Sequence, residues 1–136
     1  MITVGTSHSA MSVLPKPLSS SGFISAGSTG SGSVPTGTAA NALSLSHVTP
    51  PWGGVLCHEQ AHIVTDECGA PEFFGGGIKL IGLAGQNTKL TPSTVAAAIE
   101  RYSGHVPHQV NAAALSITQA TEGGTVYRVE IERAHM

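Results

Sequence analysis

Residues 78–84 read Ile-Lys-Leu-Ile-Gly-Leu-Ala, which is a short and largely apolar run. A run of this length that is bounded by turn residues predicts a strand buried in a sheet. Three glycines at 75–77 come just before it and predict a bent or flexible entry to the strand. The segments that follow the strand can then be placed against it.

Thr91-Pro92 predicts the start of a helix, because a hydroxyl side chain can cap the first turn and proline suits the first helical position. Apolar side chains then recur at helical spacing, at Val95, Ala98, Ile99 and Tyr102. Gly104 marks the end of the pattern. We therefore predict a helix at 92–102.

Two alternating segments, 111–119 and 125–133, flank a turn at 121–124 and predict a β-hairpin. The apolar side chains on one face of the hairpin can cover the helix stripe; they are Leu115, Ile117, Tyr127, Val129 and Ile131. Strand 78–84, helix 92–102 and the hairpin together form a β-α-β-β unit, so the predicted fold class is α+β.

Upstream of this unit, a second helix is predicted at 54–68. A Pro-Pro-Trp-Gly-Gly breaker at 50–54 precedes it, and Cys57, Ala61, Val64 and Cys68 fall on one helical stripe. A strand remains an alternative for part of this segment, because Val55, Cys57, Ala61 and Ile63 also fit alternation apart from Glu59.

His58-Glu59-Gln60-Ala61-His62 matches the H-E-x-x-H pattern of zinc peptidases. On a helix, His58 and His62 would lie one turn apart and could both reach one zinc ion. Glu59 would be rotated off that pair and could act as the general base on a metal-bound water. This predicts a metal site only if the pattern lies on a helix.

Residues 57–71 loosely resemble the active-site helix of zincin-type metallopeptidases. A catalytic zinc needs a third protein ligand. By analogy with zincins that use a glutamate there, the resemblance favours Glu100, and His105 and His108 are alternatives. A structural zinc clip of Cys57, His62 and Cys68 is a weaker hypothesis, because its spacing matches no closed zinc site. The structural alternative is that the five-residue pattern arose by chance.

The two cysteines are expected to be reduced thiols, because eleven helical positions separate Cys57 from Cys68 and a disulfide needs Cα atoms within ~7 Å. Free thiols fit synthesis in the cytoplasm. No secretory signal and no apolar run of ~18 residues is visible, so neither secretion nor a membrane span is expected. Phe73-Phe74 fits either a core position or a subunit contact.

The charge distribution divides the chain. Charged residues are 10% of the sequence, the formal net charge is −2, and residues 1–54 contain one charged residue, Lys16. The six Lys and Arg residues are scattered, which argues against a nucleic-acid-binding patch. We predict a Ser/Gly/Thr-rich, β-leaning extended arm at 1–54 and an α+β domain at 55–136.

A chain with so little charge is typical of a subunit that is surrounded by other subunits, whose contacts would order the arm. The first hypothesis is therefore a structural, self-assembling homo-oligomer, such as a virion shell, decoration or tail protein, located in the virion. Its partners would be copies of itself or other assembly subunits, and it would need no cofactor. The alternative is a small zinc metallopeptidase that uses His58, His62 and Glu59. An enzyme is the less favoured of the two.

Overall fold

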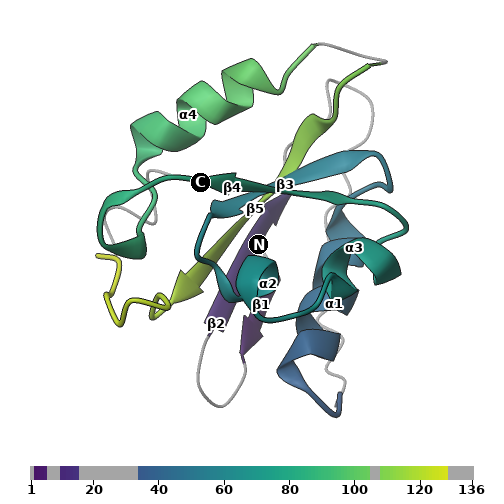
Figure 1. The fold of residues 1–136 in the computed structure, drawn as a ribbon, viewed down its shortest axis with the longest axis horizontal. Coiled ribbons are helices and arrows are strands. Elements are labelled where there is room, and N and C mark those ends of the chain that lie inside the picture. The colour runs from purple at the N-terminus through teal and green to yellow at the C-terminus, as the bar shows by residue number, and fades with distance from the viewer. Residues whose placement is uncertain (1, 6–9, 16–33, 105–107, 129–136) are drawn as a thin grey trace.

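The computed structural model describes residues 2–5, 10–15, 34–104 and 108–128. Their strands form one sheet with the order β1-β2-β5-β3-β4 (Figure 1). The strands are β1 (Ile2–Gly5), β2 (Ala10–Pro15), β3 (Gly53–His58), β4 (Lys79–Leu83) and β5 (Asn111–Gln119). β3 runs parallel to both β4 and β5, whereas β2 runs antiparallel to β5 and to β1.

Helices cover both faces of the sheet. They are α1 (Gly37–Val48), α2 (His62–Thr65), α3 (Ala70–Phe74), the 3-10 turn η1 (Gln86–Thr88) and α4 (Pro92–Arg101). α4 lies on one face, and α1, α2 and α3 lie on the other (Figure 1). Because β3 and β4, and then β4 and β5, are joined through helical segments, the described fold is a mixed α/β arrangement with a small parallel sheet.

β3 lies between two hydrophobic cores, and all six of its residues are buried. Val55 and Cys57 belong to the cluster on the α1 face, whereas Leu56 belongs to the cluster on the α4 face. Successive side chains of a strand point to opposite faces, so a strand covered on both sides is continuously apolar. The predicted helix at 54–68 is therefore wrong: the segment is a strand, a turn and the short helix α2.

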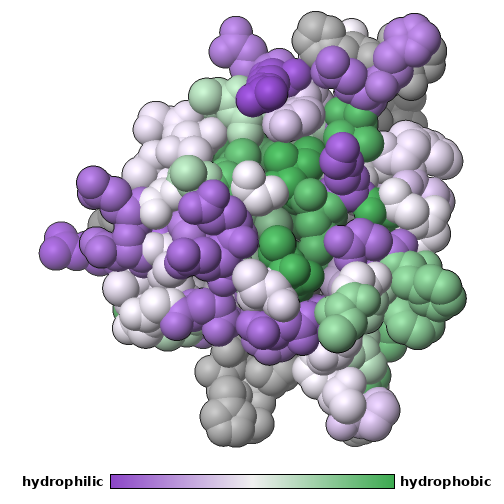
Figure 2. All heavy atoms as spheres, in the orientation of Figure 1, coloured by the Kyte–Doolittle hydropathy of each residue, from purple (hydrophilic) through white to green (hydrophobic). Residues whose placement is uncertain are grey.

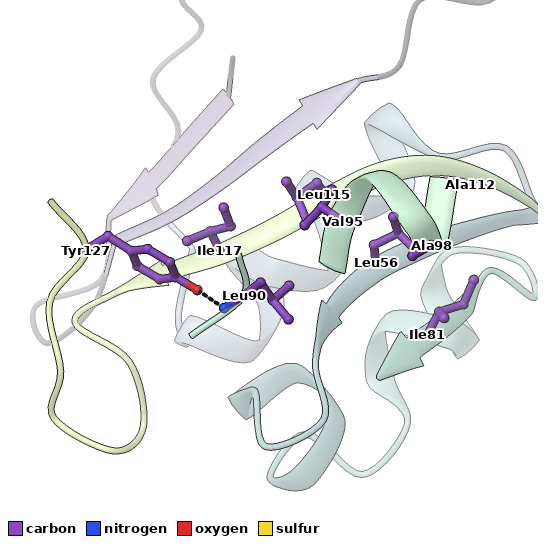
Figure 3. Packing of buried hydrophobic residues seen from close by; sticks show 9 residues of the cluster. All are labelled: Leu56, Ile81, Leu90, Val95, Ala98, Ala112, Leu115, Ile117 and Tyr127. Atoms are coloured by element: carbon purple, nitrogen blue, oxygen red, sulfur yellow. Dashed lines mark hydrogen bonds between the residues drawn. The ribbon is translucent and has the colours of Figure 1, made fainter. Parts of the chain in front are cut away.

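The larger core lies between the sheet and α4. Figure 3 shows its nine side chains converging from β3, β4, α4 and β5 and from the segments beside them. They are Leu56, Ile81, Leu90, Val95, Ala98, Ala112, Leu115, Ile117 and Tyr127. The Leu90 N–H donates a hydrogen bond to the Tyr127 hydroxyl at 2.7 Å, which fixes the segment after β5 against the start of α4.

Three predicted elements are confirmed within a residue or two, namely strand 78–84, helix 92–102 and strand 111–119. The second hairpin strand was predicted at 125–133. Residues 125–128 are not a strand, because Tyr127 folds onto the core instead, and residues 129–133 lie outside the described residues. The described part of the fold is thus built on parallel pairing around β3, not on a terminal hairpin.

The low-charge segment is not only an extended arm. Residues 37–48 form α1, which Thr36 caps by accepting a hydrogen bond from the Ala39 N–H at 3.1 Å. Leu45 of α1 is fully buried against Val55 and Cys57. Part of the low-charge segment 1–54 therefore packs against the sheet of its own chain. The predicted domain boundary at residue 54 stays a prediction.

Apolar side chains gather over the middle of the face seen in Figure 2, within a border of mostly hydrophilic ones. Phe73 and Phe74 of α3 are 79% and 66% exposed, so the core alternative for this pair is wrong. Across the described residues, we find no helix with both the length and the apolar character needed to cross a membrane.

Candidate functional site

The carboxyl ends of β3, β4 and β5 meet at one edge of the sheet because these strands are parallel. Ligands of open α/β sheets bind outside this edge. The segments that leave it begin at Glu59, Ala84 and Ala120. The His58–His62 stretch therefore lies at the edge where a site is expected, although not on a helix.

His58 ends β3 and is 7% exposed. Its Nδ1 accepts a hydrogen bond from the Gln60 N–H at 3.0 Å, so in the neutral ring the proton is on Nε2, which donates to the Gly85 carbonyl at 3.2 Å. A Cβ at Gly85 would lie 2.0 Å from the Lys89 carbonyl oxygen, so only glycine fits there. His58 uses both ring nitrogens to join two loops, and this is a structural role.

His62 is the first residue of α2, and its side chain is 44% exposed. Its Nδ1 lies 3.1 Å from Oε1 of Glu67. The same Oε1 also accepts a hydrogen bond from Asn41, so it acts as an acceptor and His62 donates its Nδ1 proton to it. No hydrogen bond to the other ring nitrogen, Nε2, is formed by the described residues. His62 therefore presents a partly exposed imidazole that a buried carboxylate holds in place.

Glu67 follows α2, and its side chain is fully buried. The same Oε1 accepts a hydrogen bond from Asn41 Nδ2 at 2.5 Å. Asn41 lies in the second turn of α1, so Glu67 joins the start of α1 to His62. The second carboxylate oxygen, Oε2, is buried and has no partner among the described residues.

The N-terminus of α1 can bind an anion. The helix has no carbonyl four residues before Gly37 or Thr38, so helix geometry leaves their N–H groups without an intrahelical acceptor. The first turn contains no acidic residue. Together with the helix dipole, these groups form a site suited to a phosphate.

A second polar cluster lies after β4 and β5. Asn87 and Thr88 both adopt left-handed backbone angles, with φ of 54° and 57°. The Thr88 hydroxyl donates to Thr121 Oγ1 at 2.6 Å, and the Thr125 hydroxyl donates to the Asn87 carbonyl at 2.7 Å. These bonds tie the two loops together at the carboxyl edge of the sheet.

Comparisons with known proteins place these observations in a family. The model of the β-eliminating lyase family matches residues 26–135, which is most of the chain. The chain belongs to this family. It is 47% identical over 93 residues to a low-specificity L-threonine aldolase of a Pseudomonas species and 46% identical over 93 residues to that of Pseudomonas aeruginosa. Each match covers 68% of this chain and 26% of the relative, so the chain spans about a quarter of the length of these relatives.

Among solved structures, the chain is similar to a Leishmania major threonine aldolase, with a TM-score of 0.56 and 27% sequence identity. The match covers 67% of this chain and 25% of that structure.

Membership of a lyase family overturns both functional hypotheses. The chain is not a virion or capsid subunit, and the interpretation that leaned away from an enzyme is wrong. The prediction of copies of the same chain as partners stays a prediction.

The zinc metallopeptidase hypothesis is also wrong. His58 lies in β3 and His62 in α2, so the one-turn helical spacing that a shared zinc requires does not exist. Glu59 is exposed, and its N–H donates to the Leu83 carbonyl. Glu100 is exposed on α4, which lies on the face of the sheet opposite to α2. His105 lies outside the described residues, and His108 is exposed. Within those residues, no group of three or more His, Cys, Asp or Glu side chains could hold a metal ion.

The zinc clip of Cys57, His62 and Cys68 has no support in the structure. Burial, with a smaller effect from the Glu72 carboxylate, raises the pKa of the Cys57 thiol from 9.0 to about 12. A zinc ligand must be a thiolate, which this environment disfavours. Both cysteines are free, as expected, but only Cys57 is buried.

The cofactor prediction, which was none or zinc, is wrong for this family, because threonine aldolases depend on pyridoxal phosphate. The described residues fit part of that group: the α1 N-terminus suits its phosphate, and His62 suits its ring. Such enzymes also hold the cofactor through a lysine. Lys79 begins β4, at the opposite end of that strand, and the Lys89 amine donates to the Val126 carbonyl at 3.1 Å. Among the hydrogen bonds of the described residues, neither lysine contacts His62, Glu67 or the start of α1.

Proposed function

We propose that the chain forms the phosphate-binding side of the cofactor site of a pyridoxal-phosphate-dependent lyase that acts on β-hydroxy-α-amino acids such as L-threonine. Family membership and the names of the two Pseudomonas relatives support the reaction class. The observation that carries the site is the bond from Asn41 to Glu67, because it joins the second turn of α1, next to the uncharged N-terminus of that helix, to the imidazole of His62.

Gly37 and Thr38 would hold the phosphate through their backbone N–H groups, and the α1 dipole would favour its negative charge. His62 would lie beside the ring, where its flat imidazole can pack and its Nε2 can accept a proton. When bound, pyridoxal phosphate supplies an electron sink for the pair left on Cα as the bond from Cα to Cβ breaks. The hydroxyl of the substrate loses its proton in the same reaction, and Nε2 of His62 is an acceptor suited to it.

The helix N-terminus can be tested by placing a carboxylate in its first turn. Thr38→Asp adds a negative charge where the phosphate would bind, while the same charge favours the helix through its dipole. We expect the affinity for pyridoxal phosphate to fall by at least about tenfold, since like charges repel over this distance. The measurement is a titration of the chain with pyridoxal phosphate followed by the phosphorus NMR signal.

α4 offers a matched control. Ser93 occupies the second helical position of α4, as Thr38 does in α1, and both helices begin after a capping threonine. Ser93→Asp should leave the affinity unchanged. Equal effects of Thr38→Asp and Ser93→Asp, or no effect of either, would show that the phosphate does not bind at α1.

A further inference from the structure

Glu67 is a buried carboxylate whose two oxygens have very different surroundings. Oε1 accepts two hydrogen bonds, from Asn41 and from His62, whereas Oε2 is buried without a partner among the described residues. Burying a carboxylate that is only half paired costs free energy. Packing alone does not explain a buried glutamate at this position. The explanation lies in the side chains to which it is hydrogen-bonded.

The neighbour that Glu67 can change is His62. A neutral imidazole has two tautomers, and the hydrogen bond at one nitrogen decides which nitrogen carries the proton. Because Oε1 of the carboxylate is an acceptor, the contact at 3.1 Å places the proton on Nδ1. Nε2 then carries a lone pair, and the side chain is 44% exposed, so this nitrogen can reach a ligand.

The backbone after Glu67 holds the carboxylate in position. Cys68 and Gly69 adopt left-handed angles, with φ of 50° and 76°, and the Ala70 N–H donates to the Glu67 carbonyl at 2.9 Å. A left-handed conformation is unfavourable for a residue with a Cβ and persists only where its surroundings impose it. The sharp turn therefore fixes the direction in which the Glu67 side chain enters the protein.

We propose that Glu67 is a positioning residue that holds His62 as the Nδ1–H tautomer and presents the Nε2 lone pair to the ligand, while Asn41 ties Glu67 to α1. The identity of the ligand rests on the proposed function; the tautomer does not. The chain contains an internal reference, because the contacts of His58 impose the opposite tautomer, with the proton on Nε2.

The first test is the tautomer of both histidines in the full chain without any ligand. With ¹⁵N-labelled histidine at about pH 8, where an ordinary imidazole is neutral, long-range proton–nitrogen NMR spectra identify the protonated nitrogen. We expect Nδ1–H for His62 and Nε2–H for His58. Detection of Nε2–H as the main form of His62 in the unmodified chain would overturn the proposal, even if no variant folded.

Two substitutions of Glu67 separate the effect of its hydrogen-bond acceptor from the effect of its side-chain volume. Glu67→Met keeps a similar volume and removes the acceptor, so His62 should lose the Nδ1–H preference while His58 keeps its Nε2–H form. Glu67→Gln keeps a carbonyl oxygen that can accept, so the Nδ1–H form should persist. An unchanged His62 tautomer in Glu67→Met would contradict the proposal.

Glu72 provides a matched control. It also has a buried carboxylate oxygen without a partner among the described residues, and none of the hydrogen bonds of His62 involves it. Glu72→Met should leave the His62 tautomer unchanged. If Glu72→Met changed it as much as Glu67→Met, the effect would be a general loss of packing, and the proposal would fail.

Titrations with pyridoxal phosphate then test whether the tautomer of His62 contributes to cofactor binding. Glu67→Met and His62→Ala should each weaken binding about fivefold, a size typical of one lost hydrogen bond, and the double variant should weaken it no further. Additive losses would mean that Glu67 does not act through His62. If the unmodified chain showed the expected tautomers but did not bind pyridoxal phosphate, the proposed function would fail while the positioning of His62 by Glu67 stood.

Discussion

The two faces of the sheet differ in what they bury. The face under α4 is apolar, apart from the Tyr127 hydroxyl, which the Leu90 N–H satisfies. The face under α1 combines apolar packing around Leu45 with the carboxylate of Glu67 and its two hydrogen bonds. The difference indicates that one face mainly provides stability, whereas the other also provides the candidate site at its edge.

Both faces should contribute to folding, and truncation of a buried leucine on each tests this. Leu45 and Leu56 are 0% and 1% exposed and lie in different clusters. Leu45→Ala and Leu56→Ala should each lower the free energy of unfolding by about 3 kcal/mol, the usual cost of lost transfer and a new cavity. Urea denaturation measures this. A much smaller loss in Leu45→Ala would mean that α1 is not part of the cooperative fold.

The thiol of Cys57 should make the α1 face sensitive to alkaline pH. Below about pH 9 the thiol is protonated in both the folded and the unfolded chain, so its ionisation does not lower the free energy of unfolding. As the pH rises toward the folded pKa of about 12, the unfolded chain ionises first and becomes favoured. We expect a loss of about 1.4 kcal/mol per pH unit above pH 9.

Urea denaturation at pH 8.5 and 10.5 measures this slope. Burial also raises the pKa of Tyr127, so its ionisation lowers the free energy of unfolding further at higher pH. Cys57→Ala should reduce the slope, whereas Cys68→Ala should keep it, because Cys68 is exposed. Equal slopes in the two variants would show that Cys57 is not buried as the structure has it.

The polar contact on the α4 face can be removed alone. Tyr127→Phe deletes the acceptor of the Leu90 N–H and keeps the ring in the core. A buried donor without a partner costs about 1–2 kcal/mol, so the free energy of unfolding should fall by that amount. Hydrogen exchange of the Leu90 amide offers a local measurement, and unchanged protection there would contradict the assignment.

The smallest effect is expected at the turn beside Glu67. Cys68→Gly relieves a left-handed angle but increases the freedom of the unfolded chain, so we expect a net gain of about 0.5 kcal/mol. Asn87→Gly is the control, because asparagine tolerates φ of 54° better and its gain should be smaller. A loss of stability in Cys68→Gly would argue against strain at this turn.

Sequence patterns predicted the α4 face well and the α1 face poorly. α4 has a capping threonine, a proline and a regular apolar stripe, so local signals and tertiary packing agree. β3 misled the prediction, because a strand buried on both faces has no polar side, and Cys57 happened to fall in helical register with Ala61, Val64 and Cys68. α1 had a signal in its Thr36 cap, but the surrounding Ser and Gly favoured an arm over a helix.

The site was only half visible in the sequence. His62 was singled out, but as a zinc ligand on a predicted helix at 54–68 that is not formed, since His62 begins the short helix α2. Glu67 was assigned no role, and Asn41 lies 26 positions from Glu67 in the chain, so no local pattern joins them. Periodicity reports which side of an element is buried, but not which distant polar side chain it meets there.

The sequence by itself determined the elements whose signals are local: the strand near 78–84, the helix that follows Thr91 and the strand at 111–119. Only the tertiary structure decided that Glu67 is buried between Asn41 and His62, and that both ring nitrogens of His58 form hydrogen bonds to the backbone. The physical reason is that capping and periodicity act within one element, whereas tautomer, burial and ligand access depend on atoms that folding brings from distant parts of the chain.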